Sequence, residues 1–280
     1  MIEPLLSDSF LLDQIQKTTP EPGQVALWWL GQSGLLIKSR HATVLIDPYL
    51  SESLTAKYAG TTKPHIRMTR CPIQPSRLGM IDIVCCTHKH SDHMDPGTLP
   101  AVLQSSPGSL LILPKALIGH ATLMGLPPER CLGLDHGETF AMPERQMTIK
   151  AISAAHEGLD QNDSGEFLYL SFLIEIDGVK LFHSGDTIPW EGQQEAVGQG
   201  VDVAFLPING RDSSRRVPGN MTSDEAVEFA TSLRVRHVIP HHYDMFTFNT
   251  VDVNEFAHAA RRLPVEVKPV ILRCGERFYI

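Results

Sequence analysis

The sequence predicts an α/β protein in which two β-sheets pack together with helices outside. Short apolar runs separated by turn residues occupy residues 25–46 and 131–182, which is typical of antiparallel strands. After each of these parts, apolar runs alternate with helical patterns, which is typical of α/β units. This order indicates that a β-rich half followed by α/β units occurs twice in the chain. Because no linker separates two parts of the chain, we expect a single domain over residues 1–280.

The first half of the chain contains the clearest buried strand. Residues 81–86 are mostly apolar and β-branched, and the run is too short for a helix. The GQSG sequence at 31–34 is a turn between two strands rather than the strand-to-helix turn of a serine hydrolase, which excludes that class. The expected elements are a helix within 1–20, strands at Val25–Leu30, Leu35–Lys38 and Thr43–Ile46, a loop over 51–80, a strand at Ile81–Cys86, a helix after Pro96, a strand at Leu110–Leu113 and a helix at Lys115–Met124.

The second half contains a hairpin signal and a helix-capping signal. Asp177-Gly178 favours a two-residue hairpin turn, and Thr222 with Glu225 three residues later forms a capping box. The expected elements are strands at Cys131–Leu134, within 137–152, at Phe167–Ile176, Val179–Phe182 and Val201–Leu206, a helix from Thr222 to Leu233, a strand at Val235–Ile239, a helix at Asn254–Leu263, and strands at Val270–Leu272 and Phe278–Ile280.

Composition and charge exclude several classes of protein. The 280 residues are 42% hydrophobic and 20% charged, which excludes a disordered chain. A net charge of −8 without a basic run argues against binding to long nucleic acid. No apolar stretch approaches the 18 residues of a membrane span. Five cysteines without a CxxC pair, and an N-terminus without a signal-peptide pattern, predict a cytoplasmic protein. As a partner we expect a small-molecule substrate and not a membrane. We also expect a homo-oligomer, with Trp28 and Trp29 in core and oligomer contacts.

The strongest functional signal is the sequence HKHSDH at 88–93, directly after the buried strand. If the strand continued, His88 and His90 would point the same way and could meet one cation. Asp92 and His93 follow in the turn and can face a second cation. Imidazole and carboxylate donors suit Zn, Mn or Fe.

Later strand ends supply further donors. His156, Asp186 and His242 each follow an apolar strand, so each can reach the same edge of the molecule. A carboxylate such as that of Asp186 can bridge two metals. Two divalent transition metals, Zn or Mn with iron as an alternative, would lower the pKa of a shared water and supply hydroxide for hydrolysis.

These motifs resemble the metallo-β-lactamase superfamily, and within it the branch of L-ascorbate-6-phosphate lactonase-like hydrolases. The resemblance covers nearly the whole chain. It rests on WWLGQSG at 28–34, THKHSDH at 87–93, GLPPERC at 125–131, LFHSGDT at 181–187, MTSDEA at 221–226 and VIPHHYD at 238–244. It implies a four-layer αββα sandwich and a metal-dependent hydrolase that opens a sugar-like lactone.

The resemblance also implies a division of the ligands between two metals. One metal would be held by His88, His90 and His156, the other by Asp92, His93 and His242, with Asp186 between them; Asp92 and Asp186 would also serve catalysis. His156 is a departure, because the lactonase of this branch lacks a histidine there. His241 competes with His242 for the last position, and the branch pattern favours His242.

Four residues outside the ligand set are further candidates. Asp47 is expected to hydrogen-bond a ligand imidazole. The loop at 209–220 carries Arg211, Arg215 and Arg216, which could bind a phosphate group of the substrate. A solvated basic loop is the alternative.

Two other functions compete with a lactonase or esterase. A phosphodiesterase acting on a small nucleotide would use the same metals. A non-catalytic metal-binding relic of the fold would lack ligands, and none is missing from this sequence.

Overall fold

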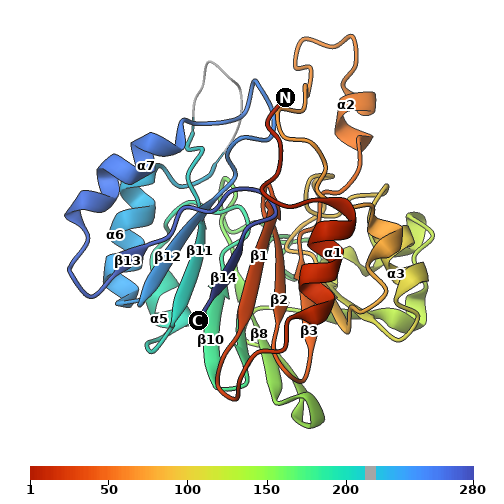
Figure 1. Cartoon of the computed structure of the whole chain (residues 1–280), viewed down its shortest axis with the longest axis horizontal. Helices are drawn as coiled ribbons and strands as arrows, with labels where there is room; N and C mark the ends of the chain where they lie inside the picture. Colours follow the sequence, from red (N-terminus) through yellow and green to blue (C-terminus); the bar gives the residue numbers. More distant parts are fainter. Residues whose placement is uncertain (212–218) are drawn as a thin grey trace.

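Two seven-stranded sheets form the centre of the computed structural model, which describes residues 1–211 and 219–280. The strand order is β14-β1-β2-β3-β4-β5-β6 in the first sheet and β13-β12-β11-β10-β9-β8-β7 in the second (Figure 1). The strands are β1 (Ala26–Gly31), β2 (Gly34–Lys38), β3 (Thr43–Ile46), β4 (Ile83–Cys85), β5 (Leu110–Pro114), β6 (Cys131–Leu134), β7 (Thr139–Met142), β8 (Met147–Ser153), β9 (Leu170–Ile176), β10 (Val179–His183), β11 (Val203–Pro207), β12 (His237–His241), β13 (Lys268–Pro269) and β14 (Arg277–Tyr279).

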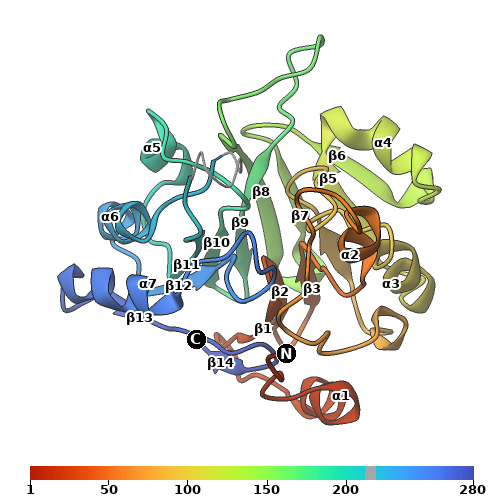
Figure 2. The ribbon, with the colours of Figure 1, turned by 90° about the horizontal axis from the view of Figure 1, so that it is seen from above.

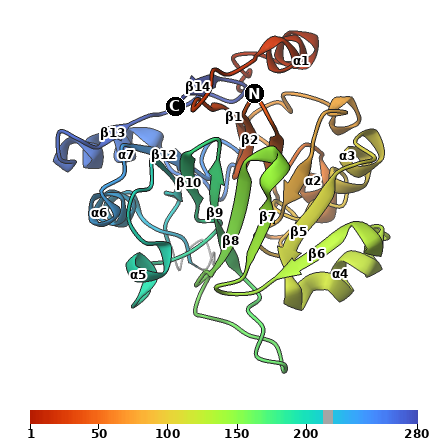
Figure 3. The ribbon, with the colours of Figure 1, turned by 90° about the horizontal axis from the view of Figure 1, so that it is seen from below.

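Helices cover the outer faces of both sheets, which gives the expected four-layer αββα sandwich. Figures 2 and 3 show α1, α3 and α4 on one side of the paired sheets and α5, α6 and α7 on the other. The helices are α1 (Asp8–Lys17), α2 (Ser53–Lys57), α3 (Leu99–Ser105), α4 (Ile118–Leu123), α5 (Gln193–Val197), α6 (Ser223–Leu233) and α7 (Val253–Ala259), with short 3-10 turns at Pro75–Arg77, Lys115–Leu117, Pro128–Arg130, Pro143–Arg145 and Ala260–Arg262. No helix among the described residues is long and apolar enough to cross a bilayer.

The strand β1 shows why whole strands of this protein are apolar. Leu27 and Trp29 point into the core between the two sheets, where they join Phe172 and other buried residues of the second sheet. Their neighbours, such as Trp28, point to the opposite face and pack with Leu11 of α1. A strand that is buried on both faces has a continuous apolar sequence. Both tryptophans are therefore core residues of the single chain.

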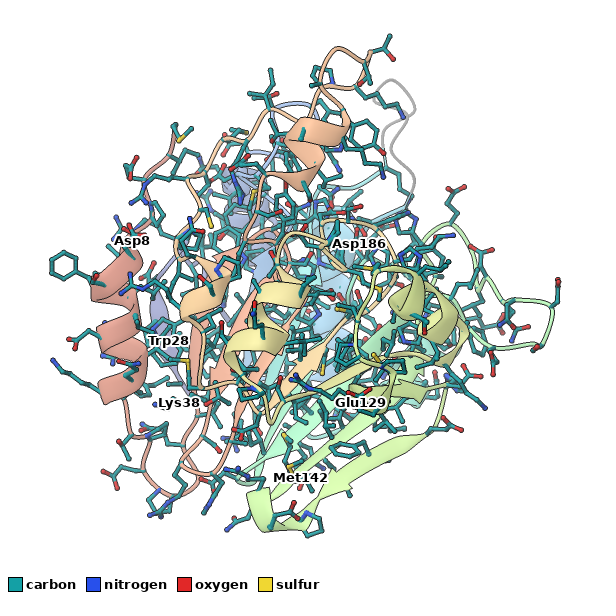
Figure 4. The ribbon with its side chains drawn as sticks, turned by 90° about the vertical axis from the view of Figure 1, so that its right-hand side faces the viewer. Asp8, Trp28, Lys38, Glu129, Met142 and Asp186 are labelled. Atoms are coloured by element: carbon teal, nitrogen blue, oxygen red, sulfur yellow. The ribbon has the colours of Figure 1, made fainter. Side chains whose placement is uncertain are left out.

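Each sheet combines an antiparallel part with a parallel part. The strands β1, β2 and β3 are antiparallel, whereas β3 to β6 run parallel. In the second sheet β7 to β10 are antiparallel, and β10 to β13 run parallel. Parallel strands end at the same edge, so the loops that follow β4, β10 and β12 leave the sandwich together. In Figure 4 Asp186, which follows β10, lies toward the upper end, whereas Met142, at the end of β7, lies at the lower end.

Three expected elements differ in the structure. Residues 51–80, expected to be loop, contain the five-residue helix α2 and a 3-10 turn. No strand lies at Val270–Leu272; the edge strand β13 is the pair Lys268–Pro269, bound to β12 at His237 and Val238. The strand expected at 235–239 lies at 237–241, because its pairing with β11 continues to Pro207 and His241.

Candidate metal centre

The loop after β4 supplies four of the candidate donors. The strand ends at Cys85, so His88 and His90 lie on turns and not on a continued strand as the sequence suggested. The turn brings them together because the backbone carbonyl of His90 accepts from the amides of His93 and Met94, at 2.9 and 2.8 Å. The ring nitrogens His88 Nε2 and His90 Nδ1 consequently lie 3.0 Å apart.

Three other loops bring the remaining donors to the same place. His156 lies three residues beyond the end of β8, Asp186 three residues beyond β10, and His242 immediately after β12. His242 has a φ of +67°, and its backbone amide donates to the carbonyl of Gln32. This backbone turn directs the His242 ring toward the loop after β4.

All seven predicted ligands meet in one buried cluster. Their donor atoms form three groups in which every atom lies within 4.8 Å of the others: His88, His90 and His156; His88, His93 and Asp186; and Asp92, His93 and His242. The first and third groups match the division that the resemblance implies. The second group places Asp186 between them.

Asp186 contacts both halves of the cluster. Its Oδ1 lies 3.3 Å from His93 Nε2, and its Oδ2 lies 3.3 Å from His242 Nε2 and 4.0 Å from His156 Nε2. His93 Nε2 and Asp186 Oδ1 are buried, and no well-directed hydrogen bond satisfies either atom within the described structure. Buried polar atoms normally have a partner. Converging atoms of this kind, on nitrogen and oxygen donors, fit a pair of transition-metal cations.

The charges of the cluster suit cation binding. Burial lowers the pKa of His156 to about 4 and the pKa of His88 well below its ordinary value, so both rings are neutral near pH 7. Burial opposes the ionisation of Asp186, but His93 and His242 hold the pKa of this carboxyl well below its ordinary value. Burial would lower the pKa of His93, yet Asp186 and other nearby carboxylates raise it well above normal. A cation would therefore displace a proton from His93.

Asp47 makes the hydrogen bond to a ligand imidazole that the sequence predicts, on the side of His93 away from the other ligands. It is fully buried and has a φ of +43°. Its Oδ2 accepts from His93 Nδ1 at 2.7 Å and from the hydroxyl of Thr87 at 2.6 Å, while its Oδ1 accepts from the amide of Thr87 at 2.8 Å. A carboxylate on Nδ1 leaves His93 Nε2 to face the cluster, as in many metal sites.

The cluster forms the floor of a pocket of about 550 Å³. Side chains of the floor include His90, His156 and Asp186, and the walls come from α2 with the loop after it, from α4 and from the loop after β12. Figures 1 and 4 show α2 at the same end of the molecule as Asp186. A volume of this size suits a small molecule.

Comparison with known proteins agrees with this geometry. The family model "Beta-lactamase superfamily domain" matches residues 42–243, which is most of the chain. The chain belongs to the metallo-β-lactamase superfamily. Its donor set is that of a metal-dependent hydrolase of this superfamily.

Relatives of the superfamily match the chain over nearly its whole length. A curated sequence from Salmonella heidelberg, named "Probable L-ascorbate-6-phosphate lactonase UlaG", is 27% identical over 96% of this chain and 85% of its own length. The solved structure of Igni18, a metallo hydrolase from Ignicoccus hospitalis, has a TM-score of 0.66 and 22% identity over 92% of this chain and 98% of its own. The metallo-beta-lactamase fold protein YhfI from Bacillus subtilis has a TM-score of 0.65 and 14% identity, covering 92% and 99%.

Gln32 is a site residue that the sequence analysis missed. It lies in the GQSG turn between β1 and β2, is fully buried, and has a φ of +51°. Its side-chain Nε2 donates to Asp92 Oδ2 at 2.8 Å and lies 3.0 Å from His242 Nε2. In the sequence this turn is read as a strand-to-strand turn and as part of the motif WWLGQSG, and neither reading assigns Gln32 a role. The available signal was a long polar side chain between two strands that are otherwise apolar.

The last histidine pair of the superfamily motif divides into two roles. His242 belongs to the cluster, whereas His241 Nδ1 lies 3.0 Å from Ser33 Oγ and its ring stacks on Phe205. The sequence favoured His242 over His241, and the structure brings His242 to the other donors.

Arg211, the one predicted phosphate-binding arginine among the described residues, does not line the described pocket. Arg211 donates to both carboxylate oxygens of Glu225 and to the backbone carbonyl of Asn220. Glu225 is the same side chain that completes the capping box of α6, so this contact fixes Arg211 at the start of that helix. Arg215 and Arg216 lie outside the described residues.

We expect the metal-free protein to lose stability as the pH falls from about 6.5 to about 4. The folded pKa of His156 is about 4, while the unfolded chain has its ordinary value near 6.5. In this window the unfolded chain binds more protons, which reduces the free energy of unfolding by on the order of 3 kcal/mol at the lower limit. His93, with its raised pKa, acts in the opposite direction but only above pH 6.5.

Denaturant unfolding in the presence of a chelator, at several pH values from 7.5 to 4, measures this dependence. The variant His156→Gln removes the titrating ring at similar size and should have a flatter profile. Identical profiles for the variant and the wild type would contradict the assignment.

Proposed function

We propose that this chain hydrolyses a small lactone or ester, sugar-like in structure, with the help of two divalent metals. One observation carries the proposal: two groups of three ligands, joined by the carboxylate of Asp186, form the floor of a pocket of about 550 Å³. The 27% identity to a protein named as an L-ascorbate-6-phosphate lactonase supports the choice of a lactone.

The residues of the cluster have distinct tasks in this proposal. His88, His90 and His156 would hold one cation, Asp92, His93 and His242 the other, and Asp186 would fix the spacing between them. When bound, the two cations would lower the pKa of a water and stabilise the negative charge that develops on the substrate. Asp47 keeps His93 in one tautomer, and Gln32 orients Asp92 through its amide hydrogen bond.

The surroundings of the cluster favour hydrolysis of a small substrate. His88, His93 and His242 are buried, whereas His90 and Asp92 are partly exposed to the pocket, where a substrate could reach the cluster. Asp92 and Asp186 remain negatively charged, since the pKa of each is lowered by His93 and His242 against the effect of burial. Either carboxylate can accept a hydrogen bond from an attacking water and hold it toward the substrate carbonyl.

The test is a substrate panel on protein loaded with Zn or Mn. We expect about two metals per chain by elemental analysis, and turnover of sugar lactones or simple esters. The variant His93→Ala should bind less metal and show no turnover. Fewer than one tightly bound metal per chain, or turnover confined to phosphodiesters, would contradict the proposal.

A further inference from the structure

The walls of the pocket carry positive charge above the metal cluster. Three lysines line it: Lys57 at the end of α2, Lys63 in the loop after α2, and Lys89 between the two histidines of the loop after β4. Among the described lining residues, the carboxylates are Asp92 and Asp186, and both belong to the metal cluster. A chain with 32 acidic and 24 basic residues thus has a basic wall beside the candidate metal cluster.

The lysine charges reach the interior of the pocket. Burial lowers the pKa of His65, in the pocket wall. A hydrogen bond to the backbone carbonyl of Lys63 and the charge of Asp92 on the floor raise this pKa, while the charges of Lys57 and Lys63 lower it. Burial lowers the pKa of His120, on another wall, and the charge of Lys89 lowers it further. The charges of Lys57 and Lys63 thus act on one lining histidine, and the charge of Lys89 acts on another.

An apolar surface lies beside these charges. The ring of His65 stacks on Tyr58 at 4.1 Å between centroids and meets Phe248 edge-on at 4.5 Å. All three side chains line the pocket. A small molecule with a ring and one charged group would match such a combination of flat and positive surfaces.

The arginines of the loop at 209–220 are the alternative for binding an anion, and Arg211, the one of them that the structure describes, is engaged elsewhere. Arg211 contacts Glu225 and the end of its own loop, and it does not line the pocket. A lysine ammonium is a compact, strongly hydrated charge, which suits an anionic group near the solvent-exposed mouth of a pocket.

We propose that Lys57, Lys63 and Lys89 bind an anionic group of the substrate, a phosphate or a carboxylate, at the opposite end from the bond that is cleaved. This inference rests on the proposed function for the presence of a cleaved bond. It assigns the selection of anionic substrates to the lysines and not to the arginine loop at 209–220.

The first measurement is binding and needs no turnover. Ligand-observed NMR with the zinc-loaded protein gives dissociation constants for glucose, glucuronate and glucose 6-phosphate. We expect the charged sugars to bind at least about tenfold more tightly than glucose, and the preference to shrink in high salt. The stronger of the two charged probes identifies the anion as carboxylate or phosphate.

Lysine-to-methionine variants test the assignment, because methionine keeps an unbranched side chain without the charge. Each single variant, Lys57→Met, Lys63→Met or Lys89→Met, should weaken the charged probes about 3–10-fold and leave glucose unchanged. The triple variant should lose the preference. Lys180→Met is the matched control, since Lys180 lies near the start of β10, whereas Asp186 follows its other end.

The outcomes separate this inference from the proposed function. A triple variant that keeps the wild-type preference for charged sugars, with an unchanged melting temperature, overturns the lysine assignment. If that preference depends on the lysines but no lactone or ester is turned over, the proposed function is wrong and the anion site remains. Turnover of neutral and phosphorylated lactones at equal efficiency, in wild type and triple variant alike, overturns the lysine assignment alone.

Discussion

Replacing Asp186 with alanine should reduce hydrolysis by about 10²–10⁴-fold while the chain remains folded. The side chain contacts three histidines of the cluster and lies in a loop after β10, so its removal leaves the two sheets intact. Removing one partner of a buried charged pair costs about 3–5 kcal/mol, and each 1.4 kcal/mol is a factor of ten in rate. In the proposed function, this loss would come from the spacing between the two cations that Asp186 would hold.

Asp186→Asn separates charge from size in this experiment. The amide keeps the shape but cannot bridge two cations as a carboxylate does, so we expect a loss close to that of Asp186→Ala. Elemental analysis should show reduced metal content in both variants. Asp163→Ala, which removes an exposed carboxylate that is not among the cluster's donors, is the control and should behave as wild type. Wild-type turnover in Asp186→Ala would show that this residue does not bridge the metals.

The strands could be predicted from the sequence because local and tertiary preferences agree there. Strands such as β1 and β4 are buried on both faces, and continuous apolar runs bounded by turn residues have few other interpretations. The edge strand β13 was misplaced because it is two residues long and pairs on one side only within the described structure. The helix α2 was missed because five residues are too few to show a helical period.

The donors of the site could be predicted for a related reason. His88, Asp186 and His242 follow strands that the sequence marks clearly, and parallel strands end at one edge. The local geometry could not be predicted: His88 and His90 meet through a turn and not through strand alternation.

Contacts between distant parts of the chain lay beyond the sequence argument. Gln32 is 60 residues from Asp92 and 210 from His242, and no local pattern connects them. The ion pair between Arg211 and Glu225 also joins residues that no local sequence pattern connects. Glu225 was recognised as a capping residue, but its carboxylate holds the arginine as well, which removes that arginine from the described pocket.

Replacing Asp47 with alanine should have the largest effect on stability of any change near the site. It would leave three buried donors without an acceptor: the amide and hydroxyl of Thr87 and Nδ1 of His93. Each unpaired buried donor costs about 1–3 kcal/mol, so for three donors we expect a loss of roughly 3–9 kcal/mol in the free energy of unfolding. Metal affinity and turnover should fall about 10–100-fold, because His93 is no longer held in one tautomer.

Asp47→Asn distinguishes the charge of this residue from its hydrogen bonds. The amide oxygen of asparagine can still accept a hydrogen bond from Thr87 or from His93. The NH₂ group then faces the other donor and cannot accept from it. We therefore expect a smaller loss of stability than in Asp47→Ala and a similar loss of metal affinity. Denaturant unfolding of the metal-free proteins and metal titration of the same samples give the two numbers. If both variants unfold like wild type, the hydrogen bonds of Asp47 do not stabilise the fold. The position of His93 would then be fixed by the other residues of the cluster.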